Sequence, residues 1–598
     1  MPEYKAPLRD IRFAMQELLD FEGHYVRLPG AEEASTDMVD AILEEAGKFA
    51  SQELSPLNQA GDQGCQLGEA GVETPAGFKQ AYARYIEGGW PSLAQAPEFG
   101  GQGLPDSLAT IVAEINGSAN WSWTMYPGLS HGAMATLMTH ATEALRDRYL
   151  PPLVEGRWTG TMCLTEPQAG SDLGLLRTRA EPNDDGSYAI TGTKIFISAG
   201  EHDMAENILH IVLARLPDAP AGNKGISLFL VPRYNVADDG SLGEANSLGC
   251  GSLEHKMGIH GNATCVMNFD GARGFLLGEP NRGLACMFTF MNNARLFIAQ
   301  QGICHAELSY QGALAYARDR LQMRSLRGAV APEKSADPII VHADVRRMLL
   351  TQKAFAEGGR AFSYLCAQLV DLAHGAEDPA ERQRAEARLA LLIPIAKGFL
   401  TEAGVEAASL GIQVFGGHGY IAEWGMEQIL RDARIAPIYE GTNGIQALDL
   451  LGRKVNGSQG ALQQGFAAEV QAFIDAERDN AALADLVIEL ERQLVRWNAL
   501  TERLIAEMGQ DPAQLGAAAF DYLMYSGYTV LAYIWARSAV TAQQALDGGS
   551  SETAFYSAKL STARFYFRRI LPRNEGLAAT LTDSADTLLE LSEEAFAL

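Results

Sequence analysis

The spacing of apolar residues changes along this chain, and that change limits the folds open to it. Residues 1–158 show helical spacing, as in the series Val39, Ile42, Leu43, Ala46, Phe49 and Ala50. Residues 159–280 instead hold short runs rich in β-branched and aromatic residues, which predict strands over 187–200, 206–216, 225–234 and 263–271. Helical spacing returns after residue 280. Because the strands form one block and do not alternate with helices, the pattern predicts an α+β fold.

Four domains follow from this pattern. We expect an N-terminal α-helical domain (1–158), a β domain built as a small sheet or barrel (159–280), an α-helical bundle (281–455) and an additional C-terminal α-helical domain (456–598). A chain of 598 residues, 47% of them apolar, is long enough to bury several cores.

Local signals refine this outline. Thr36 and Asp37 predict the start of a helix, and the Gly- and Pro-rich stretch 90–106 predicts a loop. The polar segment 456–460 predicts the last domain boundary. The aromatic and basic run 565–569 could touch a membrane surface, but a buried helix face with a basic end is the favoured interpretation.

Charge and cysteine content exclude several classes of protein. The formal net charge of -27 argues against a nucleic-acid binder, which needs a basic face. The seven cysteines are scattered without a C-x-x-C pair, so we expect neither a disulfide framework nor a metal site. The chain has no apolar run long enough for a transmembrane helix, and its N-terminus lacks the apolar stretch of a secretory signal. We therefore expect a cytoplasmic protein.

Two segments in the predicted β domain could contact a ligand. In CLTEPQAGSD (163–172), small residues allow a backbone to approach a phosphate closely, although a plain turn explains the segment equally well. In GTKIFISAG (192–200), Phe196 lies two residues before Ser198, so in a regular strand both point to one face. That pair would suit a flat heterocycle such as a flavin; a core phenylalanine in a buried strand is equally compatible.

Two further segments lie in the predicted bundle. QVFGGHGY (413–420) is not the G-x-G-x-x-G of a dinucleotide fold, and predicts a helix end or a site of close approach. In PIYEGTNGIQ (437–446), Glu440 follows an apolar run and precedes a turn. A carboxylate partly removed from water there would suit a general base, although an isolated loop glutamate is more often simply solvated.

Taken together and in this order, the four segments closely resemble the acyl-CoA dehydrogenase family, as does KMGIHGNATCVMNFD (256–270). The resemblance covers about residues 1–455. The fourth domain resembles the extra C-terminal helical domain of long members, such as bacterial fatty acyl-CoA and methylthiopropionyl-CoA dehydrogenases. The resemblance implies an enzyme that removes an α-proton and a β-hydride from an acyl-CoA and leaves a trans-2-enoyl-CoA.

The resemblance also implies roles for individual residues. The family's catalytic base corresponds to Glu440, whereas the position used as base by some other members corresponds to Ala294, which cannot act. The cofactor is FAD, and the positions expected to contact it are Met162, Leu164, Thr165, Gly170, Ser171, Phe196, Ile197, Ser198, Arg320, Gln413, Gly416, Gly417, Thr442 and Asn443. Phe196 and Ser198 stand where the family usually has Trp and Thr.

The resemblance implies the partners as well. Ser171, Arg295 and Gly441 match positions that contact the acyl-CoA substrate, while Arg453 is one residue later than the family's usual arginine. Arg320 and the segment around Gln413 match residues that complete the FAD site of a neighbouring subunit, so we expect a homodimer. Electrons from the reduced flavin would pass to an electron-transfer flavoprotein.

Alternatives remain at this stage. The leading interpretation is a medium- or long-chain fatty acyl-CoA dehydrogenase of β-oxidation, and a 3-methylmercaptopropionyl-CoA dehydrogenase is the nearest alternative. An acyl-CoA oxidase would share the fold but reoxidise the flavin with O₂. A non-catalytic acyl-CoA-binding or assembly protein is opposed by the presence of Glu440, and a flavin monooxygenase or nitroalkane oxidase would need a different base.

Overall fold

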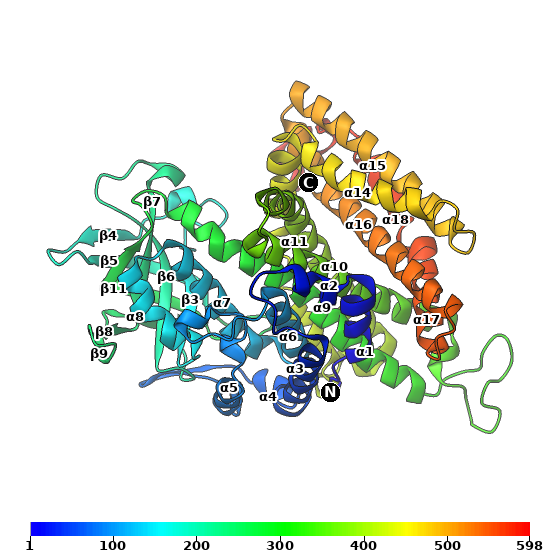
Figure 1. The fold of residues 1–598 in the computed structure, drawn as a ribbon, viewed down its shortest axis with the longest axis horizontal. Helices are drawn as coiled ribbons and strands as arrows, with labels where there is room; N and C mark the ends of the chain where they lie inside the picture. Colours follow the sequence, from blue (N-terminus) through cyan, green and yellow to red (C-terminus); the bar gives the residue numbers. More distant parts are fainter. Residues whose placement is uncertain (1, 598) are drawn as a thin grey trace. The chain divides into compact units, whose positions relative to one another are not determined.

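The computed structural model describes residues 2–597, which divide into two compact units. The β unit comprises Glu3–Ala6 and Glu33–Phe297, and the helical unit comprises Pro7–Glu32 and the chain from Ile298 onward. Figure 1 shows that the strands lie within the blue-to-green part of the chain and that the yellow-to-red part is helical. This succession confirms the predicted α+β class. Among the described residues, no helix is long and apolar enough to cross a membrane.

Helices lead into the sheet of the β unit. Its longer helices are α3 (Thr36–Phe49), α5 (Phe78–Glu87), α6 (Asp106–Ala119), α7 (Trp121–His140) and α8 (Glu143–Val154). The N-cap of α3 is Ser35, one residue before the predicted start, and its side chain accepts a hydrogen bond from the Met38 amide. Between α5 and α6, residues 90–105 are irregular apart from two short 3₁₀ turns, as the glycines and prolines predicted.

The strands of the β unit close into a small barrel. The ring has the pairing order β11–β5–β4–β6–β7, and it closes where β7 pairs with β11. Strands β3 and β10 extend the sheet outside this ring. Their bounds are β3 (Trp158–Cys163), β4 (Arg179–Pro182), β5 (Tyr188–Ser198), β6 (Asn207–Arg215), β7 (Ile226–Pro232), β10 (Leu248–Leu253) and β11 (Thr264–Leu277). The buried interior includes Ile197, Val212, Phe229 and Met267. The predicted strands are therefore confirmed.

One glycine allows α7 to pack closely on β3. A Cβ atom at Gly160 of β3 would lie 2.3 Å from the Cβ of Ala133 in α7. The Gly160 amide donates to Ser130 Oγ at 3.0 Å, so helix and strand are joined by a hydrogen bond at the same point. This contact fixes β3, whose carboxyl end leads into the loop that begins at Leu164.

The helical unit is built on long helices. The main ones after α9 (Gly283–Asp319), which spans the division between the units, are α10 (Ala343–Gly375), α11 (Pro379–Phe415), α14 (Ala461–Glu477), α15 (Ala484–Gln510), α16 (Ala513–Asp547) and α17 (Thr553–Phe565). Short helices α12 (Met426–Ala433) and α13 (Asn443–Leu448) follow α11. The run 565–569 is helical, with Tyr566 and Phe567 buried and the arginines exposed, which matches the favoured interpretation.

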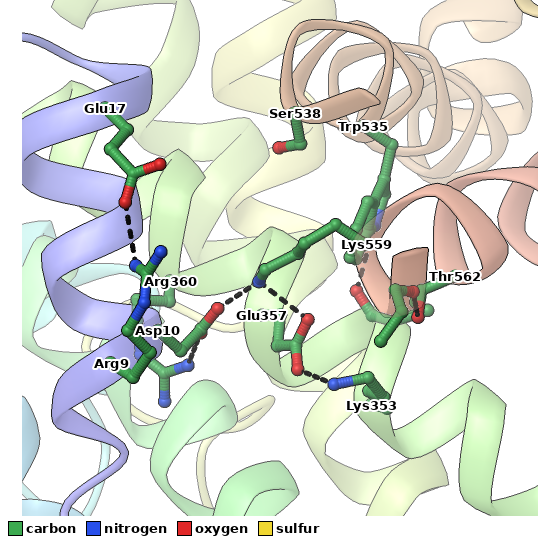
Figure 2. Close-up of polar contacts among 12 residues, drawn as sticks. Arg9, Asp10, Glu17, Lys353, Glu357, Arg360, Trp535, Ser538, Lys559 and Thr562 are labelled. Atoms are coloured by element: carbon green, nitrogen blue, oxygen red, sulfur yellow. Dashed lines mark hydrogen bonds and ion pairs between the residues drawn. The ribbon is translucent and has the colours of Figure 1, made fainter. Parts of the chain in front are cut away.

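A buried cluster of charged side chains joins the C-terminal helices to the bundle. Lys559 of α17 contacts Asp10 of α1 (Leu8–Arg12) and, at 2.8 Å, Glu357 of α10. Arg360 of α10 also contacts Asp10, as Figure 2 shows. Because every charge in this cluster faces an opposite charge, burial is tolerated and the three elements are held in register.

Candidate active site

The loop after β3 is a tight turn closed on itself. The amide of Glu166 donates to the carbonyl of Ala169 at 3.0 Å, and the amide of Ala169 donates back to Glu166 at 2.9 Å. Beyond it, Gly170 and Ser171 are exposed. The segment CLTEPQAGSD thus presents small, accessible residues on a rigid base, which the sequence predicted for a ligand-binding loop.

A buried ion pair holds this loop from beneath. Lys194 of β5 is fully buried and Glu166 is 4% exposed. Lys194 Nζ donates to Glu166 Oε1 at 2.8 Å and to the carbonyl of Leu164 at 2.9 Å. Glu166 also accepts hydrogen bonds from the amides of Arg177 at 2.7 Å and Thr178 at 3.0 Å. The pair therefore fixes the backbone of the residues expected beside the flavin ring.

Burial and pairing act on the two charges in opposite directions. Burial by itself raises the pKa of Glu166, but Lys194 and the hydrogen bonds outweigh it and lower that pKa to about 2. Burial lowers the pKa of Lys194, and the ion pair with Glu166 offsets only part of that effect. The carboxylate consequently stays ionised at neutral pH.

Phe196 departs from the regular strand. Its φ is 59°, and β5 carries one extra residue between the pairs Lys194–Met267 and Ile197–Cys265, so the strand bulges at this point. The bulge leaves Phe196 59% exposed while Ile197 is buried. The interpretation of Phe196 as a core residue, one of the two that the sequence allowed, is therefore wrong. We expected the side chains of Phe196 and Ser198 to share one face because side chains alternate along a regular strand. The bulge interrupts that alternation.

These features fit a flat aromatic cofactor that carries phosphates. The exposed ring of Phe196 can cover one face of a heterocycle, and a Cβ at Gly170 would meet no heavy atom within 4 Å, so the loop backbone is open to a ligand. In the helical unit, Gly416 and Gly417 after α11 are equally open, and Gly416 has a φ of 59°. Arg320, Gln413, Gly416 and Gly417 are all exposed.

The candidate base lies in a turn of left-handed backbone between α12 and α13. Glu440 has a φ of 56° and Gly441 a φ of 85°. A non-glycine residue at positive φ is uncommon and costs about 1–2 kcal/mol, so the surrounding structure must hold it. Thr442 ends the turn by capping α13, where its side chain accepts from the Ile445 amide at 3.2 Å. The Glu440 side chain is partly buried.

Side chains from two helices hold the turn. Lys397 of α11 donates to the carbonyl of Gly441 at 2.8 Å and to Asn443 Oδ1 at 2.9 Å. Gln446 Nε2 of α13 donates to the carbonyls of Glu440 and Gly441, each at 3.3 Å. The amide of Asn443 donates to the carbonyl of Pro437 at 2.9 Å. The backbone on both sides of the carboxylate is therefore fixed.

The arginines expected near the substrate lie in different environments. Arg295 is only 5% exposed and lies 5.9 Å from the Phe288 ring centre. Arg453 is exposed and pairs with Asp449 at 2.7 Å. A recess of about 450 Å³ lies beside the CLTEPQAGSD loop and is lined by Gln168, the exposed Arg177 and Arg215. The sequence did not indicate this recess, because its lining comes from three separate segments.

Sequence reasoning missed the residues that support both loops. Lys194, Glu166, Lys397 and Gln446 were not singled out, although one signal was present. Each lysine adjoins apolar residues: Lys194 comes directly before IFI, and Lys397 interrupts the run PIAKGFL. A charged residue there is either directed to solvent or buried with partners, and only the structure distinguishes the two.

Four domain families match consecutive parts of the chain. They are described as acyl-CoA dehydrogenase N-terminal domain (36–157), middle domain (161–272) and C-terminal domain (281–455), and acetyl-CoA dehydrogenase C-terminal like (466–592).

Two relatives match along the whole chain. A 3-methylmercaptopropionyl-CoA dehydrogenase of Ruegeria pomeroyi is 44% identical over 98% of this chain and 100% of its own. A butyryl-CoA dehydrogenase of Syntrophomonas wolfei is 32% identical over 99% of each.

A solved structure has the same fold. The acyl-CoA dehydrogenase of Bacillus anthracis, crystallised with FAD, superposes with a TM-score of 0.74 over 95% of this chain and 91% of its own, at 20% identity. The match extends into the C-terminal helices that follow residue 455. With full-length relatives at 44% and 32% identity, the chain belongs to the acyl-CoA dehydrogenase family.

Proposed function

We propose that this protein is an FAD-dependent acyl-CoA dehydrogenase that converts an acyl-CoA into a trans-2-enoyl-CoA, with Glu440 as the base. The observation that carries the proposal is the turn at Glu440, in which a carboxylate on left-handed backbone is fixed from α11 and α13. Such strain is retained where the carboxylate must be held in one place. The proposal is further supported by the exposed Phe196 ring and the open loop at Gly170.

The residues divide the chemistry between them. Glu440 takes the proton from the carbon next to the thioester carbonyl, and its own backbone N–H donates to that carbonyl as negative charge develops there. Bound FAD would supply the acceptor for the hydride that leaves the β-carbon. Phe196, Ser198 and the 162–171 segment would hold its ring and phosphates, and the resemblance adds Thr442 after the base. Asn443, also expected there, is buried and its carboxamide is bound to α11. Excluding water around Glu440 strengthens the carboxylate as a base.

The CoA portion needs local positive charge, because the chain as a whole is strongly acidic. Within the β unit, the recess at Gln168, where Arg177 is exposed, offers such charge to its phosphates. The resemblance puts Gly441 beside the thioester. Arg295 is buried, which favours a role within the protein over direct contact with a solvated phosphate. Ser171, which is exposed on the loop, is available to the pantetheine chain or to FAD.

Two substrate classes are supported. The resemblance to long family members favours a straight-chain fatty acyl-CoA, and the butyryl-CoA dehydrogenase relative agrees with it. The relative with 44% identity instead favours 3-methylmercaptopropionyl-CoA, a short acyl group with sulfur in place of a methylene. Both undergo the same α,β-dehydrogenation, so one site can be tested with both.

Two further parts of the proposal concern partners. The exposed Arg320, Gln413, Gly416 and Gly417 would contact FAD bound to a second copy, which makes the enzyme a homodimer. Reduced flavin would be reoxidised by an electron-transfer flavoprotein and not by O₂. The cytoplasmic location expected from the scattered cysteines stays a prediction.

The test is reduction of the purified flavoprotein under anaerobic conditions. Each of a series of straight-chain acyl-CoAs, butyryl to eicosanoyl, and 3-methylmercaptopropionyl-CoA is mixed with the protein while the flavin absorbance is followed. Bleaching by at least one substrate, with formation of the enoyl-CoA, is expected, and the fastest substrate identifies the class. Slow reoxidation in air is expected; rapid reoxidation with peroxide would indicate an oxidase. Failure of every acyl-CoA to bleach the flavin would refute the proposed function.

A further inference from the structure

Lys397 is a buried cation at the turn that carries the candidate base. It lies in the middle of α11, and its residue is 0% exposed. Its Nζ donates to the carbonyl of Gly441 and to Asn443 Oδ1, which lie one and three residues after Glu440. Removing an ammonium group from water is costly, so this arrangement is retained only where its hydrogen bonds recover that cost.

Asn443 extends the contact along one turn of α11. Its Nδ2, which carries two hydrogens, faces three acceptors: Glu402 Oε1 at 2.8 Å, Thr401 Oγ1 at 3.0 Å and the carbonyl of Gly398 at 3.2 Å. Because Lys397 donates to Oδ1, both the oxygen and the nitrogen of the Asn443 carboxamide are hydrogen-bonded, and the orientation of the group is fixed. Three side chains of α11, those of Lys397, Thr401 and Glu402, thus attach the first residue of α13 to a helix more than forty residues earlier in the chain.

We propose that Lys397 is a positioning residue for the dehydrogenation: through the Gly441 carbonyl and Asn443 it holds the Glu440 carboxylate where it can remove the α-proton. This rests on the proposed function, in which Glu440 is the base. Without Lys397 the Gly441 carbonyl loses its charged donor and the left-handed pair Glu440–Gly441 can relax. A displacement of about 1 Å at a reacting group can cost about 10²-fold in rate.

A second buried lysine provides a control for the loss of a buried cation. Lys559 is 3% exposed and lies among Asp10, Glu357 and the Trp535 ring, in the cluster of Figure 2. It holds α17 against α10 and α1, and its ion-pair partners Asp10 and Glu357 lie outside the turn at Glu440. Replacing it should lower the melting temperature without changing the chemistry of the folded flavoprotein.

The experiment compares Lys397→Met with Lys559→Met in the FAD-loaded, full-length protein. With a substrate that reduces the wild type, Lys397→Met should slow flavin reduction at saturation by about 10- to 100-fold while the Kd for acyl-CoA changes less than about threefold. The deuterium isotope effect at the α-carbon should increase, because proton removal becomes more rate-limiting. Lys559→Met should leave all three quantities at wild-type values.

A second readout needs no substrate. Amide hydrogen exchange over residues 436–446 should be faster in Lys397→Met than in wild type, and unchanged in Lys559→Met. Lys397→Gln, which keeps a neutral donor, should give intermediate values and serves if the methionine variant does not fold. The inference would be overturned if a folded Lys397 variant kept the wild-type rate of flavin reduction, the wild-type isotope effect and the wild-type rate of amide exchange. If no acyl-CoA reduces wild type, the proposed function fails, and the exchange comparison still tests the effect on the turn.

Discussion

The two loops expected to meet the ligand are both held by a buried lysine, but in different ways. In the β unit, Lys194 holds the 164–169 backbone while paired with the buried carboxylate of Glu166. In the helical unit, Lys397 donates to the carbonyl of Gly441 and to Asn443 Oδ1. The first arrangement balances charge within the fold. The second directs a positive charge at the turn that carries the base.

This difference separates stability from chemistry. Breaking an ion pair leaves an uncompensated buried charge, and the main effect is on folding and on the shape of the cofactor loop. Removing Lys397 takes a donor from the Gly441 carbonyl and from Asn443 Oδ1, and the main effect is on how well the turn is held. We therefore expect Lys194 variants to lose mainly folding stability, and Lys397 variants to lose mainly the rate of flavin reduction.

The largest effect is expected for Lys194→Met. It would leave Glu166 as a buried carboxylate without its cation, which costs about 3–5 kcal/mol of folding free energy. The loop at Leu164 would also lose a donor, so the amount of FAD bound per chain should fall. The melting temperature measures the loss of stability, and the ratio of flavin to protein absorbance measures the amount of FAD bound.

The double variant Lys194→Met/Glu166→Gln tests the cause. With no charge left on either side, it should melt at a higher temperature than Lys194→Met alone. Equal melting temperatures for the single and double variants would show that the buried charge is not the source of the loss.

A smaller effect is expected for Gly441→Ala. The φ of 85° is costly for alanine, and the new Cβ would lie 2.6 Å from Gln446 Nε2, so the turn must shift. We expect a loss of about 1–2 kcal/mol of stability and slower flavin reduction by acyl-CoA, measured by melting and stopped-flow absorbance.

Gly444→Ala is the matched control. Gly444 is exposed in the first turn of α13, and a Cβ there would meet only Thr442 Oγ1, at 3.7 Å. Because alanine is the better helix former, this variant should be as stable as wild type or more so, by up to about 1 kcal/mol. If both variants slowed the reaction equally, strain at Gly441 would not be the reason.

The smallest effect is expected on the pH dependence of stability. The pKa of Glu166 is about 2 in the folded protein, against an ordinary value of 4.5. Its ionised form therefore stabilises the fold fully above pH 4.5, and this contribution is lost as the pH falls from 4.5 towards 2. The difference in melting temperature between wild type and Glu166→Gln should be constant from pH 7 to 5 and narrow below 4.5. If the difference in melting temperature grew as the pH fell, the pKa of Glu166 would not be lowered in the folded protein.

The sequence predicted most of the fold and the position of both loops. Helical and strand periodicities are local signals, so α3, β6, β7 and the long helices could be read directly. The exposure of Phe196 could not, because it depends on an extra residue in β5 opposite β11. Glu440 was identified through the resemblance, since its surroundings alone predicted only a solvated loop residue.

The supporting lysines required tertiary information. Lys194 meets Glu166 28 residues away, and Lys397 meets Gly441 44 residues away. A lysine beside apolar residues has the same local pattern whether its ammonium group reaches solvent or a buried partner. The three domain boundaries at 158, 280 and 455 stay predictions, because the two compact units divide the chain near residue 297 and do not test them.

The most direct test of the central claim is anaerobic mixing of the Glu440→Gln flavoprotein with the best acyl-CoA of the wild type. The amide keeps the size of the side chain but cannot accept the proton, so FAD should bind normally and its reduction should slow by about 10³-fold or more. Reduction at a rate close to that of the wild type, in a variant that has bound FAD, would show that residue 440 is not the base.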